Sequence, residues 1–226
     1  MIESLKDDAL QVLAVYDKML AYRIQEEVLQ CLVKIYPDHS IKEAVETKVK
    51  LLNLFYSTGI QAVNVAAQQI LSIESIDVRL KKGERTLVHE IAKVNLSNNK
   101  TRNNYSFATK YCAYHKPRLY PIYDSVVAKV FIRLFEKGLL PKYKYSRRHS
   151  VEPNTFTKKE FAEKLKDYKF FCYIYVYFRK EYDLRGLTFR QIDSYLWGAF
   201  KIAGANFRIK ELADIDTTKI TQSVID

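Results

Sequence analysis

The spacing of apolar residues constrains this chain most, because it follows the period of an α-helix almost from end to end. Only 6 Gly and 5 Pro interrupt the 226 residues, which argues against a turn-rich sandwich or barrel and against a glycine-loop nucleotide fold. The sequence therefore predicts an all-α multi-helix bundle. Its helices are expected at about 4–21, 24–36, 41–56, 60–71, 84–94, 105–115, 124–137, 157–182 and 188–201.

Local signals support several of these helices. Capping boxes, in which a Ser or Thr and a Glu or Gln three residues later satisfy backbone N–H groups, begin at Ser40, Thr157 and Thr188. The segment Phe170–Phe178 has the aromatic and β-branched composition of a strand, but no other segment resembles it. A lone strand leaves its backbone unpaired, so we expect this segment to be helical. The most loop-like stretches are 96–104 and 138–153.

Composition excludes several other classes of protein. Hydrophobic residues make up 48% and charged residues 28%, as in ordinary globular proteins, and no apolar run approaches the roughly 18 residues of a membrane span. Three scattered cysteines predict reduced thiols, with neither a disulfide framework nor a metal or iron–sulfur site. We expect a cytoplasmic monomer without cofactor, folded as one unit over 1–226 or as two helical lobes.

Positive charge is concentrated in the window from Lys100 to Arg148. This window holds twelve Lys and Arg against two acids, Asp124 and Glu136, a balance of +10 where the whole chain carries +11. Clustered cations are typical of a surface that binds nucleic acid, because neutralised phosphates release counterions. Tyrosines lie between the cations and can stack on exposed bases. A solvated helix face with a basic loop is the alternative interpretation.

Asp124 has a specific setting inside this window. It follows the proline-bearing segment Tyr120–Tyr123 and precedes an amphipathic helix, so the spacing predicts that it is the helix N-cap. The helix N-terminus and the surrounding cations favour its ionised form. Helix capping alone also explains an aspartate at this position.

The stretches Tyr105–Lys110 and Tyr120–Val127 resemble the second half of the helix-hairpin-helix DNA glycosylase signature. In that superfamily two helices grip a DNA phosphate, and a Pro-x-x-Asp segment delivers the catalytic aspartate at the next helix start. The flanking segments 48–58 and 191–197 resemble an uncharacterised bacterial branch of these proteins. The resemblance implies a hairpin and an aspartate-bearing segment within 84–137.

The chain departs from that signature at two points. The expected hairpin loop has no glycine, although its asparagines tolerate the left-handed conformation better than most residues. The nucleophilic lysine of bifunctional members would fall at Tyr105, whereas Lys110 lies fourteen residues before Asp124. Lys110 would supply lyase activity if it reaches the site; a phosphate contact or a packed, snorkelling lysine are the other interpretations.

The resemblance implies a DNA glycosylase that removes a damaged or modified base, with Asp124 as the catalytic carboxylate. A nucleic-acid-binding protein that lost catalysis on the same scaffold is the first alternative, and a helical protein that binds an acidic partner is the second. The expected base pocket comprises Asn53, Tyr56 and Tyr123, although a turn asparagine and a packed tyrosine explain Asn53 and Tyr56 equally well. The expected DNA contacts are Lys100, Arg102, Asn104, Tyr105, Ser106, Lys116, Arg118, Lys129, Arg147 and Arg148.

Overall fold

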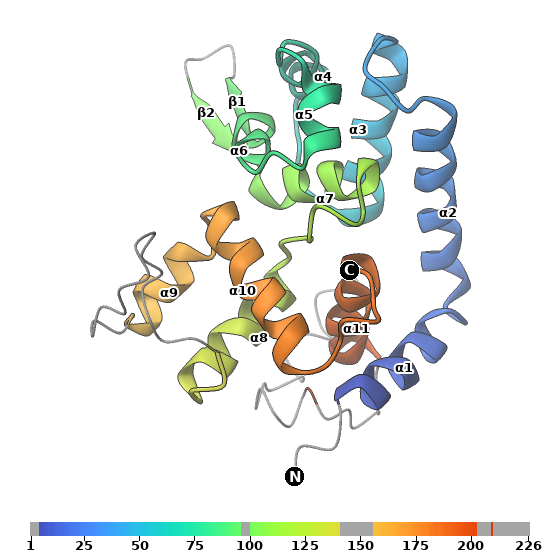
Figure 1. The fold of residues 1–226 in the computed structure, drawn as a ribbon. Helices are drawn as coiled ribbons and strands as arrows, with labels where there is room; N and C mark the ends of the chain where they lie inside the picture. Colours follow the sequence, from blue (N-terminus) through green and yellow to red (C-terminus); the bar gives the residue numbers. More distant parts are fainter. Residues whose placement is uncertain (1–4, 96–99, 141–155, 203–208, 210–226) are drawn as a thin grey trace. The chain divides into compact units, whose positions relative to one another are not determined.

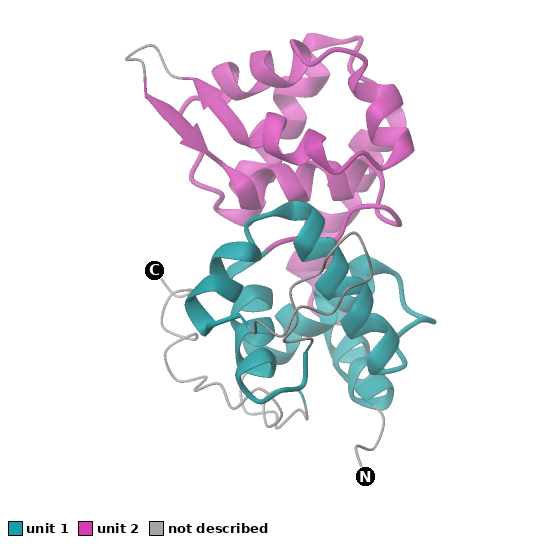
Figure 2. Cartoon of the chain, turned by 60° about the vertical axis from the view of Figure 1, so that its left-hand side comes forward, with its two compact units in different colours: residues 1–16, 124–226 teal, residues 17–123 magenta. Residues whose placement is uncertain are grey.

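The computed structural model describes residues 5–95, 100–140, 156–202 and 209, which form eleven helices and one two-stranded sheet (Figure 1). The prediction of a mainly helical protein is confirmed. The chain divides into two compact units (Figure 2). One unit is residues 17–123, and the other joins residues 1–16 to residues 124–226.

Helix α7 (Tyr105–His115) is the buried centre of the unit of residues 17–123. Each of its residues except Ser106 is buried, as expected for a helix surrounded by others. The described elements of this unit are α2 (Leu20–Ile35), α3 (Lys42–Tyr56), α4 (Val63–Leu71), α5 (Ile76–Lys82), α6 (Thr86–Ala92), β1 (Lys93–Asn95), β2 (Thr101–Asn103) and α7 (Tyr105–His115).

A β-hairpin connects α6 to α7, which corrects the expectation of a loop and of a fold without strands. Strands β1 and β2 are antiparallel, with Val94 opposite Arg102. The backbone N–H of Asn104 then donates to the Ala92 oxygen at 2.8 Å and closes the base of the hairpin. These bonds join residues on or next to two different strands, so local apolar spacing does not reveal them.

Two further local features differ from the sequence prediction. Helix α5 lies where the spacing predicted none, and it ends at Gly83, whose φ of +70° is a conformation that glycine adopts without strain. Ser40 is not a helix cap. Its hydroxyl donates to an Asp38 carboxylate oxygen at 2.6 Å, and Ile41 takes the N-cap position.

The second unit is built around aromatic side chains. The Phe131 ring on α8 (Ser125–Glu136) lies 5.6 Å from the Tyr175 ring and 5.4 Å from the Phe178 ring, between ring centres. The first helix joins this unit through the buried Asp8 carboxylate, which accepts from the Tyr195 hydroxyl at 2.7 Å. Its described helices are α1 (Leu5–Tyr16), α8 (Ser125–Glu136), α9 (Lys158–Lys164), α10 (Tyr168–Glu181) and α11 (Phe189–Lys201).

Helix starts in this unit follow the sequence signals closely. The capping boxes at Thr157 and Thr188 are both formed, and Phe170–Phe178 is helical as expected. The single helix predicted over 157–182 is wrong. Asp167 accepts from the backbone N–H groups of Lys169 and Phe170 at 3.0 and 3.3 Å, and so begins a separate helix, α10.

Candidate functional site

Two hydroxyl groups fix the segment that ends at Tyr123 to helix α7. Ser106 Oγ donates to the Tyr123 backbone oxygen at 3.1 Å, and Thr109 Oγ1 accepts from the Tyr123 backbone N–H at 3.1 Å. Thr109 is fully buried, and its hydroxyl donates to the Ser106 backbone oxygen at 2.9 Å. We call these contacts of Ser106 and Thr109 with the Tyr123 backbone the Tyr123 anchor. They hold the backbone of the residue that immediately precedes Asp124.

We expect Thr109→Val to lower the free energy of unfolding by about 1 to 3 kcal/mol, because valine keeps the side-chain shape but leaves the Tyr123 N–H without its acceptor. Chemical denaturation measures the difference. The matched control is Thr47→Val, since Thr47 is exposed on α3 and its hydroxyl only donates to the Glu43 backbone oxygen. The control should change this free energy by less than about 0.5 kcal/mol, and equal effects would contradict the anchor.

Lys110 lies one turn beyond Ser106 on α7 and is only 4% exposed. Its Nζ donates to Ser106 Oγ at 2.7 Å and lies 5.6 Å from the centre of the Tyr56 ring. The hydroxyl oxygen and the negative face of the ring both stabilise an ammonium group. Such burial does not fit the interpretation of Lys110 as a surface phosphate contact. Instead, the lysine is hydrogen-bonded to Ser106, which is part of the Tyr123 anchor.

The Glu26 carboxylate and the Tyr114 hydroxyl hold the Tyr56 ring in place. Glu26 on α2 accepts from the Tyr114 hydroxyl at 2.8 Å and from the Tyr56 hydroxyl at 3.4 Å, and the two hydroxyls contact each other. Glu26 and Tyr114 were not among the residues predicted for the site. Glu26 lies 88 residues from Tyr114, and no motif connects them.

Asn53 takes the alternative role, that of a turn residue. Its Oδ1 accepts from Thr58 Oγ1 and from the Ile60 N–H, both at 2.9 Å, and its Nδ2 donates to the Ile60 oxygen at 2.9 Å. The amide therefore braces the turn around Gly59, where φ is +71°. We leave Asn53 out of the candidate site for this reason.

Asp124 is half-buried at the start of α8, and the prediction that it is an N-cap is confirmed. Its Oδ1 accepts from the Val126 backbone N–H at 2.8 Å. The Lys201 ammonium group, in the same unit, interacts electrostatically with this carboxylate. Burial lowers the pKa of Lys201, and the negative charge of Asp124 opposes part of that shift. Lys201 is 77 residues from Asp124 in the sequence and was not among the predicted site residues.

The basic residues expected to contact DNA divide between the two ends of α7. Lys100 and Arg102 precede the helix and are exposed, and Arg102 donates to the Gly59 backbone oxygen at 3.2 Å. Lys116 and Arg118 follow the helix, whose eleven residues span about 16 Å at 1.5 Å per residue. The predicted contacts in residues 17–123 therefore do not form one cluster.

The remaining predicted contacts have varied surroundings. Asn104 is half-buried before α7, and Lys129 is exposed on α8 in the other unit. Tyr105 is 8% exposed, and its ring stacks on His89 with 5.6 Å between ring centres and lies 4.7 Å from the Tyr123 ring. Arg147 and Arg148 lie outside the described residues.

A second group of titratable residues lies in the unit of residues 17–123, outside the predicted site. The buried His39 ring bonds through Nδ1 to the Asp77 carboxylate at 2.7 Å and through Nε2 to the Tyr111 hydroxyl at 2.8 Å. Lys48 is 1% exposed and donates to the Asp38 backbone oxygen at 3.1 Å. Burial lowers the pKa of Lys48 to about 8 and also lowers the pKa of His39.

The described part of the chain offers few ligands for a metal ion. It contains no group of three or more His, Cys, Asp or Glu side chains placed to bind one. Cys31 is exposed, whereas Cys112 and Cys172 are buried, and none of the three forms a disulfide within the described residues. No helix in the described ranges combines the length and the apolar character needed to cross a membrane.

Comparison with known proteins gives one family and one curated relative. The family HI_0787_N, described as an N-terminal domain, matches residues 8–119. A protein of Haemophilus influenzae named "Uncharacterized protein" is 34% identical over 160 residues, which cover 71% of this chain and 68% of that protein. No solved structure matches the chain. The family match includes Ser106, Thr109 and Lys110 and ends before Asp124.

Proposed function

The chain belongs to the HI_0787_N family, and we propose that it is a DNA glycosylase of the helix-hairpin-helix type. Its reaction is the excision of a damaged or modified base by cleavage of the N-glycosidic bond. The Tyr123 anchor is the observation that supports this function most directly. Ser106 and Thr109 hold the peptide group in front of Asp124, so the candidate carboxylate starts from a fixed backbone position.

Asp124 has the chemistry that this reaction needs. Cleavage of the N-glycosidic bond builds positive charge on the sugar, and a fixed carboxylate beside the sugar stabilises that charge. Water adds its oxygen to C1′, and the base departs with the bonding electrons and receives a proton. The target nucleotide must leave the base stack first, and the exposed cations Lys100, Arg102 and Lys129 are the groups we assign to the DNA backbone.

In this function Lys110 is a positioning residue, and base release occurs without strand scission. Its amine is buried and already bonded to Ser106 Oγ, so it is not presented as a nucleophile for a Schiff base. We expect the product strand to remain intact until it is treated with alkali, as gel electrophoresis can show. Cleavage before alkali, together with borohydride trapping that Lys110→Met abolishes, would instead establish the lyase alternative.

A DNA-binding protein without catalysis is the second candidate, and the hairpin favours it. A glycine-rich turn lets backbone N–H groups approach a phosphate, whereas α6 and α7 are joined here by two strands. Both candidates predict binding to DNA, and only the first predicts release of a base.

Incubation with a panel of duplexes, each carrying one modified base, tests the proposal. We expect the free base to be released from at least one duplex, detected by mass spectrometry. Binding to the same duplexes should weaken log-linearly as salt is raised. Salt-dependent binding without release from any duplex would select the second candidate. No salt-dependent binding would overturn both.

A further inference from the structure

Helix α2 carries a continuous apolar stripe on its exposed side. Leu20, Ile24, Val28 and Ile35 are 58%, 49%, 41% and 61% exposed, and Cys31 is exposed between them. At 100° per residue these five side chains fall within an arc of about 80°. Leu29 is the only buried residue of this 16-residue helix. The stripe is therefore an apolar helix face that the rest of the described chain leaves open.

The stripe is self-complementary when two copies of α2 run antiparallel. Their a- and d-type positions then pair Ile24 with Ile35 of the other copy, and Val28 with Cys31 of the other copy. In this register the part of the stripe from Ile24 to Ile35 is covered, and the two pairings repeat on either side of the two-fold axis, as a closed dimer requires.

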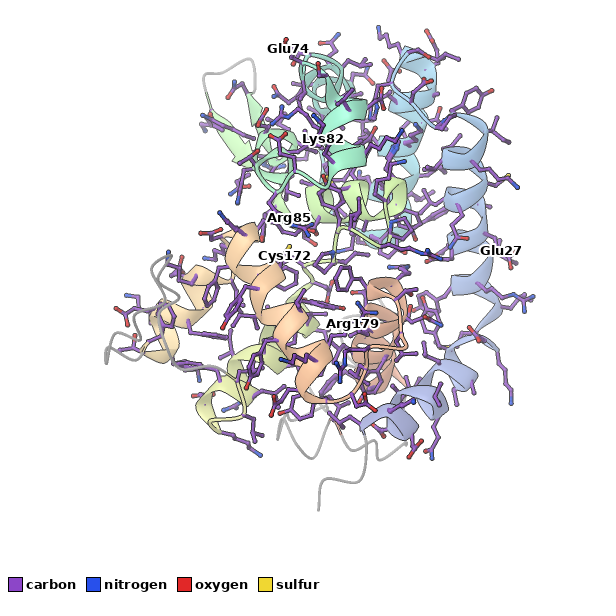
Figure 3. The ribbon with its side chains drawn as sticks, viewed as in Figure 1. Glu27, Glu74, Lys82, Arg85, Cys172 and Arg179 are labelled. Atoms are coloured by element: carbon purple, nitrogen blue, oxygen red, sulfur yellow. The ribbon has the colours of Figure 1, made fainter. Side chains whose placement is uncertain are left out.

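Charged residues along one edge of the stripe fit the same arrangement. Glu27 is exposed on the outward side of α2 (Figure 3), and Lys34 lies seven residues further along the same edge. The antiparallel register brings Glu27 of each copy within reach of Lys34 of the other. A parallel pair would instead leave each Glu27 beside the apolar Leu32. The edge charges therefore favour a second copy of this chain in antiparallel orientation.

We propose that the chain forms a homodimer through antiparallel packing of α2 against α2. The stripe extends about 22 Å along the helix, and two such faces with their polar edges bury on the order of 1,000 Å², the lower range of specific interfaces. The dimer is thus of moderate affinity. This replaces the assumption of a monomer and is independent of the proposed activity.

The mass in solution tests the dimer, and apolar variants test its location. Wild-type chain at about 100 μM should sediment at twice the 26.5 kDa of the monomer. Ile24→Glu should weaken dimerisation at least about 100-fold. Leu54→Glu is the matched control, because Leu54 is 71% exposed on α3 and lies outside the stripe. A wild-type chain that stays monomeric, or equal weakening by both variants, would overturn the proposal.

Charge exchange tests the antiparallel register and does not alter the apolar stripe. Glu27→Lys places like charges together across the dimer and should raise its dissociation constant about tenfold. The double variant Glu27→Lys with Lys34→Glu should restore the constant to within about threefold of wild type. A dimer that neither weakens with the single change nor recovers with the double change would overturn this arrangement. Circular dichroism confirms that each variant is folded.

Discussion

Replacement of Asp124 by Asn is expected to reduce base release on the order of 10³-fold and to change DNA affinity by less than about twofold. Asparagine caps a helix as well as aspartate does, so the bond to the Val126 N–H is retained. What the variant loses is the negative charge that stabilises the developing positive charge on the sugar. Single-turnover release from the best duplex of the panel, with titration of the same duplex, measures both quantities.

Asp167→Asn is the matched control for this experiment. Asp167 also caps a helix, α10, by accepting from two backbone N–H groups, and it is exposed. The two substitutions make the same chemical change at equivalent helix positions, so any shared effect is an effect on capping. We expect Asp167→Asn to release the base at the wild-type rate. Equal release by wild type and Asp124→Asn would refute the role assigned to Asp124.

The parts of the fold that the sequence predicted correctly are those set by neighbouring residues. Thr157, Thr188 and Asp124 each cap a helix through bonds to residues two or three positions ahead, and all three were identified from local sequence. Helical apolar spacing likewise depends on residues within one or two turns. Such signals are contained in a short window and need no knowledge of the tertiary fold.

The errors have physical causes of a different kind. The β1–β2 pairing depends on cross-strand bonds such as those of Val94 opposite Arg102, and strands of three residues show too little alternation to be recognised. The predicted helix over 157–182 combined two helices, because the apolar spacing continues through the cap at Asp167. Ser40 has the spacing of a capping box, but its hydroxyl bonds to Asp38 instead.

The candidate site was predictable only along one stretch of chain. Asp124 and its neighbourhood were found because the segment from Tyr105 to Val127 is continuous in sequence. Glu26 and Tyr114 were not found, because a carboxylate and a phenol that meet through folding carry no shared motif. The burial of individual charged side chains could not be predicted from the sequence either. Nothing in its sequence context distinguishes the buried Lys110 from an exposed lysine of a basic surface.

Lys48→Met is expected to make the pH dependence of stability shallower in the alkaline range. Lys48 has a pKa of about 8 when folded and 10.5 otherwise, because burial disfavours its charge. Between these values the unfolded chain holds a proton that the folded chain has lost, so the stability of the wild type rises with pH. Below pH 8 the folded state bears the full cost of the buried charge, about 3 kcal/mol.

The stability of Lys48→Met relative to wild type should therefore decrease by about 2 to 3 kcal/mol between pH 7 and pH 10, as urea denaturation at both pH values can measure. The lowered pKa values of His39 and His115 act below pH 6.5, outside this range, and the tyrosines are common to both proteins. Lys50→Met is the control, because the Lys50 side chain is 58% exposed on the same helix. If both variants keep the wild-type pH profile, the Lys48 amine is not buried as described.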